Sequence, residues 1–316
     1  MMKLAMIMDP IESVKTYKDT SFRLLLEAQA RNYELYYLTM DDLSIAASEP
    51  MGRARSVTVV DQPTDFYTLG EPTEMNLGSF DVILMRKDPP FDTEFVYATY
   101  ILELAERRGA LVVNRPQSLR DCNEKLFTAW FPELTPPTIV TRRAEQIRAF
   151  HKEHRDIILK PLDGMGGASI FRVREDGTNL GVIIETLTNH GHQFAMIQRY
   201  LPEISDGDKR ILIIDGEPMP YALARVPSAG ETRGNLAAGG SGRPQPLSDS
   251  DWELARKVGP ELKRRGLTIV GLDVIGDRVT EINVTSPTCM REIESAYDIN
   301  IAAKVFEAIE RQLGLC

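Results

Sequence analysis

A lysine at the end of an apolar run is followed by a cluster of glycines. The run starts at Ile157, and the residues that could contact a phosphate are Lys160, Gly164, Met165, Gly166 and Gly167. Glycines let backbone N–H groups approach a phosphate without a Cβ in the way, and a nearby lysine supplies positive charge. The segment is neither a Walker A sequence nor the dinucleotide-binding fingerprint. A plain hairpin turn would account for the glycines equally well, so the phosphate-binding interpretation needs partners elsewhere in the chain.

Two carboxylates and one amide lie close together in the C-terminal part of the sequence. A turn at Gly276 and Asp277 would place Asp273 on one strand and Glu281 with Asn283 on the next. Alternate residues of a strand share a face, so three oxygen donors would converge. Oxygen donors without a nearby Cys or His suit Mg²⁺, with Mn²⁺ as a second candidate. The alternative is that these residues face solvent, but they interrupt an otherwise apolar strand.

Basic side chains lie between these two segments. Lys209 and Arg210 enter a strand, where a pair of cations could hold a phosphate or a developing anion. A solvated edge strand is the competing interpretation. The stretch 226–242 that follows is rich in glycine and alanine and contains Arg233. It suits a mobile lid that excludes water from a phosphorylated intermediate, and a disordered linker is the alternative.

The N-terminal part of the chain alternates predicted strands with predicted helices. The strands cover Lys3–Met8, Tyr33–Leu38, Val82–Met85 and Ala110–Val113, and the helices cover Phe22–Arg31 and Glu94–Arg108. This alternation predicts an α/β fold with a parallel, doubly wound sheet. Such sheets bind ligands in loops after the carboxyl ends of strands, here Asp9–Ser13 and Arg86–Asp88, and Arg86 is the stronger candidate. Between residues 41 and 80 the pattern predicts only a short strand near Val57–Val60.

After residue 137 the pattern changes to strands that are close enough in sequence to form hairpins. The predicted strands are Thr138–Val140, Ile157–Lys160, Ser169–Val173, Met196–Tyr200, Ile211–Ile214, Tyr221–Arg225, Val270–Ile275 and Val279–Val284. They predict antiparallel sheets, with one hairpin turn at Asp215-Gly216. Helices are expected over Ala144–His151 and Trp252–Arg265, and a capping box of Ser250 and Glu253 would open the second helix.

The composition of the chain indicates which partners to exclude and in which cellular compartment to expect the protein. The chain has 316 residues, a formal net charge of −9 and a pI near 5.2, so its surface repels phosphate backbones and anionic membranes. We therefore expect neither nucleic acid nor membrane as a partner. No apolar run approaches the roughly 20 residues that cross a bilayer, and the first apolar stretch ends at Asp9, too short for a signal peptide. Three widely spaced cysteines are expected as reduced thiols, in a cytoplasmic protein.

Taken together, the motifs have the order and spacing of an ATP-grasp ligase. The segments that carry a more specific resemblance are Arg86–Asp92, Asn114–Asp121, Asn123–Leu126, Lys160–Gly167, Glu231–Asn235 and Asn283–Thr288. They resemble the bacterial glutathione synthetase family, and the likeness runs nearly from Met1 to Cys316. The resemblance implies an N-terminal Rossmann-like substrate domain, residues 1–122, and an ATP-grasp domain, residues 123–316. Within the second domain it implies a nucleotide-grasping subdomain, 138–200, and the lid, 226–242.

The resemblance also implies a reaction. ATP would drive the ligation of γ-glutamylcysteine and glycine through an acyl phosphate, giving glutathione, ADP and phosphate. Positioning and electrostatic stabilisation would dominate, because phosphoryl transfer needs no nucleophilic side chain of the enzyme. A homotetramer is implied by the family alone. Two alternatives stay open, an ATP-grasp ligase for another amino acid or peptide and a non-catalytic ATP-binding regulatory protein.

The residue roles that the resemblance implies fall into four groups. The nucleotide would be bound by Lys125, Lys160, Gly164, Met165, Gly166, Gly167, Gln198, Tyr200, Leu201 and Asp208, the adenine by Gln198, Tyr200 and Leu201, and the ribose near Asp208. The metal ligands would be Asp273, Glu281 and Asn283. The substrates would be bound by Arg86, Arg210, Arg233, Asn283, Ser286, Pro287, Arg291 and Glu292, the last four residues at the glycine end. The catalytic residues would be Lys160, Arg210 and Arg233.

Overall fold

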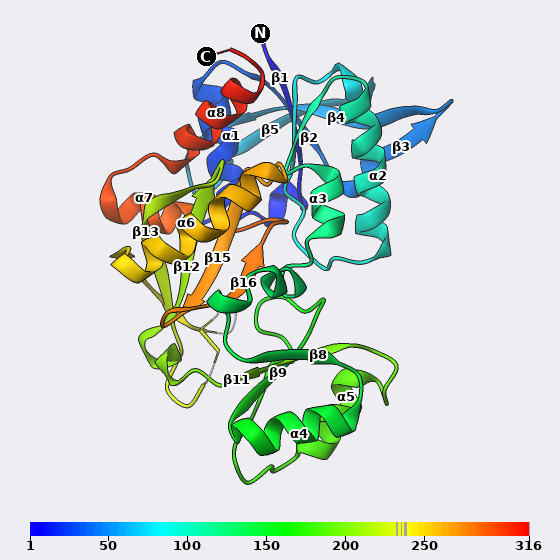
Figure 1. Cartoon of the computed structure of the whole chain (residues 1–316). Coiled ribbons are helices and arrows are strands. Elements are labelled where there is room, and N and C mark those ends of the chain that lie inside the picture. Colours follow the sequence, from blue (N-terminus) through cyan, green and yellow to red (C-terminus); the bar gives the residue numbers. More distant parts are fainter. Residues whose placement is uncertain (232, 235, 237–238, 316) are drawn as a thin grey trace.

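The computed structural model describes residues 1–231, 233–234, 236 and 239–315. Three β-sheets follow one another along the molecule, and the N-terminal sheet and both chain ends lie at the same end of it (Figure 1). Four positions of the predicted lid, Thr232, Asn235, Ala237 and Ala238, lie outside the described residues, as does Cys316. Among the described residues, no helix has the length and apolar character that crossing a membrane requires. The predicted α/β class is confirmed.

The first sheet, sheet A, is parallel at its centre. Its strands are β1 (Lys3–Ile7), β2 (Glu34–Leu38), β3 (Leu43–Ala46), β4 (Glu49–Val59), β5 (Tyr67–Asn76), β6 (Val82–Met85) and β7 (Leu111–Val113). Their order is β3-β4-β2-β1-β6-β7, with β5 paired to β4. Strands β2, β1, β6 and β7 run parallel, whereas β4 pairs antiparallel with β2, β3 and β5. The four strands predicted from the N-terminal pattern form the parallel part.

Helices cover both faces of the parallel part of sheet A. They are α1 (Thr20–Ala30) and α2 (Thr93–Arg107), followed by the short α3 (Pro116–Asp121). Successive side chains of β1 point to opposite faces, so Ala5 and Ile7 share a core with Phe95 of α2, whereas Leu4 shares another core with Phe22 of α1. This alternation within near-continuous apolar strands is the reason why the sheet is buried on both sides.

A long antiparallel hairpin lies where the sequence predicted one short strand. Strands β4 and β5 pair along most of their length, and β3 pairs with the start of β4. Strand β4 alternates buried and more exposed positions, with Ala54, Val57 and Val59 on its buried side. The prediction missed the rest of this strand because Pro50 and Gly52 break the apolar alternation by which a strand is recognised.

The second sheet, sheet B, is small and antiparallel. Its strands are β8 (Thr138–Thr141), β9 (Ile157–Pro161), β10 (Phe171–Val173) and β11 (Ala195–Arg199), in the order β10-β9-β11-β8. Helices α4 (Ala144–His154) and α5 (Leu180–Thr188) cover one face (Figure 1). Ile147 and Leu187 of these helices share a separate core with Leu159 and Ile197 of the sheet. Sheet B therefore has its own core and can hold Lys160 at the end of a fixed strand.

The third sheet, sheet C, is antiparallel throughout. Its strands are β12 (Asp208–Ile214), β13 (Glu217–Val226), β14 (Ser241–Pro246), β15 (Ile269–Ile275) and β16 (Arg278–Asn283), in the order β14-β13-β12-β15-β16. Helices α6 (Asp249–Arg264), α7 (Met290–Tyr297) and α8 (Ile301–Gln312) pack around it. The predicted hairpin turn is confirmed, since Asp215 and Gly216 have φ of 52° and 84° between β12 and β13.

The predicted capping box of α6 was wrong. The capping serine lies two residues earlier, at Ser248, whose Oγ accepts a hydrogen bond from the Asp251 backbone N–H at 3.2 Å, while Asp251 Oδ2 accepts one from the Ser248 backbone N–H at 3.0 Å. The sequence repeats the serine-to-acid spacing in two registers, so the pattern alone does not choose. The fully buried Asp251 also pairs with Lys209, and this tertiary contact favours the earlier register.

Buried side chains join sheet A to sheet C. Asn114, directly after β7, donates from Nδ2 to the carbonyls of Ile269 and Val284 at 2.8 and 2.7 Å, and its Oδ1 accepts from the Ile269 backbone N–H at 2.8 Å. In addition, Arg23 of α1 forms an ion pair with Glu294 of α7, with 2.7 Å between Nε and Oε2. These contacts fix the loops after β1 and β6 relative to β15 and β16, where the candidate site lies.

Candidate active site

Two cavities meet at one carboxylate. The large cavity, about 430 Å³, lies between the loops of sheet A and one face of sheet C, and the small cavity, about 80 Å³, lies between sheets B and C. Glu281 of β16 lines both of them. A molecule held in the small cavity can therefore present its charged end to a second molecule in the large one.

The small cavity combines apolar walls with the predicted nucleotide residues. The aliphatic side chains that line it include Ile158, Ile170, Ile204 and Ile275. The predicted residues that line it are Lys160, Gln198, Tyr200, Leu201 and Asp208. A narrow space between branched aliphatic side chains, with few polar groups at its edge, suits a planar heterocycle such as adenine. The isoleucines escaped the sequence analysis because apolar strand residues look the same whether they pack in a core or line a ligand site.

Asp208 gives the small cavity a buried hydrogen-bond acceptor. Its Oδ2 accepts from Arg225 Nη2 at 2.5 Å, and its Oδ1 has no hydrogen-bond partner among the described residues. Burial raises the pKa of Asp208 to about 6, opposed by Arg225 and assisted by Asp273 and Glu281. A buried acceptor without a partner suits a hydroxyl donor, such as those of a ribose.

Lys125 and Lys160 converge on Glu281 from different segments of the chain. Their Nζ atoms lie 3.7 and 3.3 Å from Oε1 of Glu281, and each lysine is 4% exposed. Burial lowers the pKa of Lys160, and Glu281 offsets only part of that effect. Burial alone would raise the pKa of Glu281, but the two ammonium groups outweigh it and the pKa falls below its ordinary value. Two buried cations beside one carboxylate leave positive charge for an anion such as a polyphosphate.

The predicted glycine-rich loop lies against Lys125. Lys125 Nζ donates to the Gly164 carbonyl at 2.6 Å, and Arg233 Nη1 of the predicted lid donates to the Gly167 carbonyl at 3.2 Å. Gly166 and Gly167 have φ of 61° and 81°, a conformation that favours glycine. The loop residues that line the large cavity are Gly164, Met165 and Gly166. The loop, Lys125 and a lid arginine are thus brought together.

Asp273 lies behind the cavity wall and holds two arginines. Its carboxylate accepts from Arg210 Nε and Nη2 at 2.5 and 2.9 Å and lies 2.8 Å from Arg225 Nη2. Burial alone would raise the pKa of Asp273, but the two guanidinium groups hold it well below its usual range. Arg210 and Arg225 both line the large cavity. The predicted ligand Asp273 is therefore placed where it orients cations.

Gly271 of β15 makes room for this arrangement. A Cβ at this position would lie 2.7 Å from Cδ of Arg210 and 2.9 Å from Cβ of Pro287. Because both neighbours line the large cavity, a side chain here would displace the cavity wall. The sequence analysis gave Gly271 no role, although a glycine inside a strand is itself a sign of close approach by another group.

The residues around Glu281 fit a divalent cation. Glu281 and Asn283 line the large cavity, and Asn283 Nδ2 donates to the Gly271 carbonyl at 3.2 Å, which leaves its amide oxygen as an acceptor. Carboxylate and amide oxygens are the ligands that Mg²⁺ prefers. The described part of the chain contains no group of three or more His, Cys, Asp and Glu side chains that could hold a metal. A cation here would complete its shell with water and with phosphates bound by the lysines.

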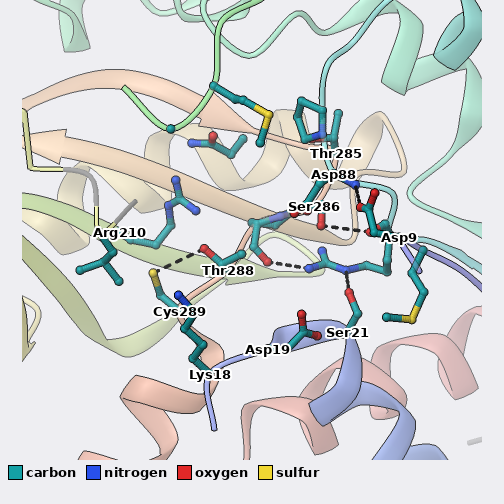
Figure 2. A pocket seen from close by; sticks show the side chains of 18 of the residues that line it. Asp9, Lys18, Asp19, Ser21, Asp88, Arg210, Thr285, Ser286, Thr288 and Cys289 are labelled. Atoms are coloured by element: carbon teal, nitrogen blue, oxygen red, sulfur yellow. Dashed lines mark hydrogen bonds between the residues drawn. The ribbon is translucent and has the colours of Figure 1, made fainter. Parts of the chain in front are cut away.

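The loops after the adjacent parallel strands β1 and β6 both reach the large cavity, as the sequence predicted for such a sheet. Asp9 Oδ2 accepts from the Asp88 backbone N–H at 2.9 Å, and its other oxygen pairs with Lys87 at 2.8 Å. Figure 2 shows Asp9 and Asp88 together at one side of the cavity, with Ser21 below them and Arg210 at the opposite side. The cavity wall thus combines loops of sheet A with strands of sheet C.

Arg86 is buried in this wall with one donor unused. Its Nε donates to Ser21 Oγ at 3.2 Å and its Nη2 to the Pro287 carbonyl at 2.8 Å, while Nη1 has no hydrogen-bond partner among the described residues. Its own carbonyl accepts from Ser286 Oγ at 3.2 Å. Burial lowers the pKa of Arg86, but an arginine stays charged in proteins. An unused N–H on a buried guanidinium suits a carboxylate ligand.

The adjacent predicted substrate residues Arg291 and Glu292 occupy different environments. Arg291 donates from Nη1 to the Thr16 carbonyl at 2.6 Å and pairs through Nη2 with Asp61 at 2.7 Å, outside the cavity lining. Glu292 lines the large cavity, and its Oε2 is buried without a hydrogen-bond partner in the described part of the chain. The other predicted substrate residues that line the large cavity are Arg86, Arg210, Asn283, Ser286 and Pro287, whereas Arg233 lines the small cavity.

Several cavity residues escaped the sequence analysis. They are Lys18, Asp19 and Ser21, and Figure 2 shows all three around the cavity. They lie just beyond the loop Asp9–Ser13 that the sheet rule singled out, so extending that loop to the start of α1 would have found them. Arg225 ends a predicted strand and contacts Asp208 across the β12–β13 hairpin.

The fold and the paired cavities define an ATP-grasp ligase. The chain is similar to the crystal structure of D-cycloserine synthetase DcsG, with a TM-score of 0.68 and 13% identity over 98% of this chain and 99% of that one. It is also similar to the ATP-grasp ligase PsnB complexed with minimal precursor, Mg and ADP, with a TM-score of 0.62 and 18% identity over 99% and 98% of the two chains. At such identities the likeness shows the fold.

The family follows from sequence. Residues 2–120 match the N-terminal domain of prokaryotic glutathione synthetase, and residues 124–298 match its ATP-grasp domain. Glutathione synthetase of Shewanella oneidensis is 63% identical over 99% of this chain and 100% of that protein, and that of Salmonella typhimurium is 62% identical over the same shares. The chain belongs to the prokaryotic glutathione synthetase family. It is an ATP-dependent ligase, so the predicted family, fold and enzyme class are confirmed, and the ATP-grasp domain implies the use of ATP and a divalent metal.

Proposed function

We propose that the protein joins γ-glutamylcysteine to glycine, forming glutathione while ATP is converted to ADP and phosphate. The observation that carries this proposal is the meeting of the small and large cavities at Glu281, beside Lys125 and Lys160. An acid in the large cavity would lie next to the phosphates of a nucleotide in the small one. The choice of acid and amine is supported by the identity of 62–63% to relatives named glutathione synthetase.

ATP would lie in the small cavity with its adenine between the isoleucines and the backbone of β11. The residues proposed at the adenine are Gln198, Tyr200 and Leu201, with Asp208 at the ribose. The phosphates would pass Lys160 and Lys125 and contact the loop of Gly164, Met165, Gly166 and Gly167. Because both lysines already face the carboxylate of Glu281, phosphate oxygens would compete with it for their N–H donors.

We propose that the divalent metal is Mg²⁺, held by Glu281 and Asn283 together with phosphate oxygens, and that Mn²⁺ can replace it. When bound, the ion would neutralise phosphate charge and polarise the transferred group. Asp273 would join as the third predicted ligand only if Arg210 or Arg225 released one of its oxygens. Titrating ADP release with each metal in turn tests this assignment.

The reaction would run in two steps, neither of which needs a nucleophilic side chain of the protein. A cysteinyl carboxylate oxygen forms a bond to the γ-phosphorus, the bond from phosphorus to the β,γ-bridging oxygen breaks, and ADP leaves. The glycine amine then attacks the acyl carbon, phosphate leaves with its bonding electron pair, and the amine loses a proton. Lys160, Arg210 and the lid residue Arg233 would stabilise the moving negative charge, and the closed lid would exclude water.

Glycine would enter beside the loop after β16. Ser286 and Pro287 line the large cavity there, and Arg233 of the lid contacts the glycine-rich loop nearby. Arg291, whose guanidinium is paired with Asp61 and the Thr16 carbonyl, would support this region without touching glycine.

We further propose the domain boundaries and the assembly that the family resemblance implies. Residues 1–122 would form the substrate domain, and residues 123–316 the ATP-grasp domain, with 138–200 as the nucleotide-grasping subdomain and 226–242 as the lid. The protein would be a cytoplasmic homotetramer. Light scattering of the purified protein and fractionation of the source cells test these two statements.

The deciding experiment is ADP release by the purified protein with ATP, Mg²⁺, γ-glutamylcysteine and glycine, omitting each component in turn. Turnover that requires all four components and yields glutathione by mass is the expected result. If ATP binds but this mixture releases no ADP, the assignment as a ligase stands and the assignment of the substrates is wrong. A screen of other acids and amines would follow. ATP binding without ADP release for any acid and amine would point to a regulatory protein.

A further inference from the structure

The segment 123–125 joins the glycine-rich loop to the strand that carries the proposed metal ligands. Asn123 Nδ2 donates to the Leu162 carbonyl at 3.2 Å, and Lys125 Nζ donates to the Gly164 carbonyl at 2.6 Å, so both hold the start of this loop. The residue between them, Glu124, contacts β16 and the residues just after that strand. The proposed reaction gives Glu124 no role, although this residue lines the large cavity.

A single carboxylate oxygen of Glu124 accepts three hydrogen bonds from the chain after β16. Its Oε1 accepts from the backbone N–H groups of Val284 and Thr285 at 2.9 and 3.1 Å, and from Thr285 Oγ1 at 2.9 Å. The backbone carbonyl of Glu124 accepts from the Ile282 N–H at 2.9 Å. Asn283, a proposed metal ligand, therefore lies between two residues that are both hydrogen-bonded to Glu124.

No ion pair supplements these hydrogen bonds of Glu124 among the described residues. The nearby Lys125 and Lys160 pair with Glu281 instead. Burial raises the pKa of Glu124, and the hydrogen bonds that its carboxylate accepts oppose this effect. Separating an acceptor from three donors that it satisfies is costly inside a protein. The carboxylate and the chain after β16 therefore hold each other in place.

We propose that Glu124 is a positioning residue, which holds Asn283 at a fixed place relative to Lys125 so that a cation and the phosphates of a nucleotide can be bound side by side. The inference rests on the metal assignment of the proposed function and adds a residue that acts through its neighbours. The hydrogen-bond acceptor at position 124, and not its negative charge, is the feature that matters. Loss of a group that orients a metal ligand typically weakens metal binding on the order of 10- to 100-fold.

The test measures metal binding without turnover. Mn²⁺ is titrated into the full-length protein saturated with ADP, and the free ion is measured by electron paramagnetic resonance. Glu124→Ala leaves the three donors without their acceptor, so the Kd for Mn²⁺ should rise on the order of 10- to 100-fold. Glu124→Gln keeps an oxygen that accepts from the same donors and removes only the charge, so the Kd should change less than about threefold.

Asp42→Ala is the matched control for the loss of such an acceptor. Asp42 Oδ2 accepts from the backbone N–H and the hydroxyl of Thr39 at 2.7 and 2.9 Å, and Asp42 does not line the large cavity. This variant should lower the temperature of thermal unfolding, as Glu124→Ala does, and leave the Kd for Mn²⁺ unchanged. The comparison separates a general loss of stability from a loss of metal positioning.

Two outcomes would overturn the inference. An unchanged Kd for Mn²⁺ in Glu124→Ala would show that the carboxylate positions nothing at the metal, and an equal rise in Glu124→Gln and Glu124→Ala would show that its charge acts directly. If Glu124→Ala does not fold, Thr285→Val removes one of the three donors and should raise the Kd about 2- to 10-fold, the effect of one hydrogen bond. No rise would then overturn the inference.

The inference and the function on which it rests fail in different measurements. If the wild-type protein forms no glutathione, the proposed substrates are wrong, and the Mn²⁺ titrations still decide the role of Glu124 because they need only ADP. If the wild-type protein forms glutathione but its ADP complex binds no Mn²⁺, the function stands and the positioning of a metal ligand by Glu124 is wrong.

Discussion

The two cavities differ in how their residues are assembled. The small cavity is walled by aliphatic side chains and strand backbone, and most of its predicted residues lie in β9, β11 and the segment just after β11. The large cavity is walled by charged side chains from loops and helix ends that are distant in sequence, such as Asp19, Arg86 and Glu292. Most of the predicted residues of the small cavity are close together in the sequence, whereas the charged residues of the large cavity are far apart in it.

This difference teaches which interactions each cavity can provide. An apolar slot binds through area and shape, so its contribution is similar in the ground state and in the transition state. Buried charges aimed at a reacting carboxylate act mainly where charge moves, so they lower the barrier. We therefore expect changes to the aliphatic side chains of the small cavity to alter the KM for ATP and changes to the charged side chains of the large cavity to alter kcat.

The largest effect is expected from Arg210→Met. The change removes a guanidinium that lines the large cavity and leaves Asp273 paired with Arg225 alone, and loss of one such charge-stabilising group typically costs about 10²- to 10³-fold in kcat. Because Arg210 lines the large cavity and not the small one, the ATP affinity measured by calorimetry should change less than about threefold, which is below 1 kcal/mol. Arg243→Met on exposed β14 is the control. A loss of ATP affinity as large as the loss of kcat would break the proposed division between the cavities.

A smaller but similar effect is expected from Gly271→Ala. The added Cβ would meet Arg210 Cδ at 2.7 Å and Pro287 Cβ at 2.9 Å, so the arginine must move. Misplacing a charge-stabilising group costs about tenfold or more in kcat, and ATP affinity should be retained. Gly181→Ala in α5 is a matched control, because its Cβ would meet only Arg148 Nη2, at 3.4 Å. Equal kcat for the two variants would show that a side chain at position 271 does not displace Arg210.

The small cavity is probed by Ile275→Ala, with Ile275→Val as the conservative control. Removing most of a side chain that lines the adenine space should raise the KM for ATP about tenfold, from the loss of roughly 1–2 kcal/mol of apolar contact. The kcat at saturating ATP should stay unchanged, and valine should change the KM about twofold. Initial rates across a range of ATP concentrations provide both values. A fall in kcat with unchanged KM would contradict the placement of adenine.

The smallest effect is a pH dependence at the junction of the cavities. Burial lowers the pKa of Lys160 from its ordinary value, and phosphate binds its charged form. Affinity for ATP is therefore complete below the pKa of the free protein and falls as pH rises through it, with proton uptake on binding. Calorimetry between about pH 7.5 and 9.5 in buffers of different ionisation enthalpy measures both quantities, a shift of one pKa unit corresponding to about 1.4 kcal/mol.

Lys160→Arg is the matched variant for that measurement. A guanidinium stays charged throughout this range, so the pH dependence should flatten even if the affinity itself is lower. Constant affinity with no proton uptake in the wild-type protein would show that Lys160 is not the phosphate ligand or that its pKa is not lowered.

Much of the fold followed from local patterns, and the errors have physical causes. The parallel strands of sheet A and the hairpins of sheets B and C were predicted because their apolar runs and turn residues lie within short windows. The β4–β5 hairpin was missed since Pro50 and Gly52 break the apolar alternation of β4, and α5, α7 and α8 were not predicted. The start of α6 was wrong because Lys209, distant in sequence, contacts Asp251.

The sequence by itself indicated the family and the class of reaction. It also supplied the residues that we propose for the phosphates and the metal, since Lys160, the glycines after it, Glu281 and Asn283 lie in short motifs. Only the tertiary structure decided which side chains share a cavity. Asp273 pairs with Arg210 and Arg225, and Arg291 pairs with Asp61 outside the cavity that Glu292 lines. The absence of a side chain at Gly271 leaves the space that Arg210 occupies. The reason is that a motif fixes spacing along one strand, whereas pairing and burial of charges depend on partners brought together from distant segments.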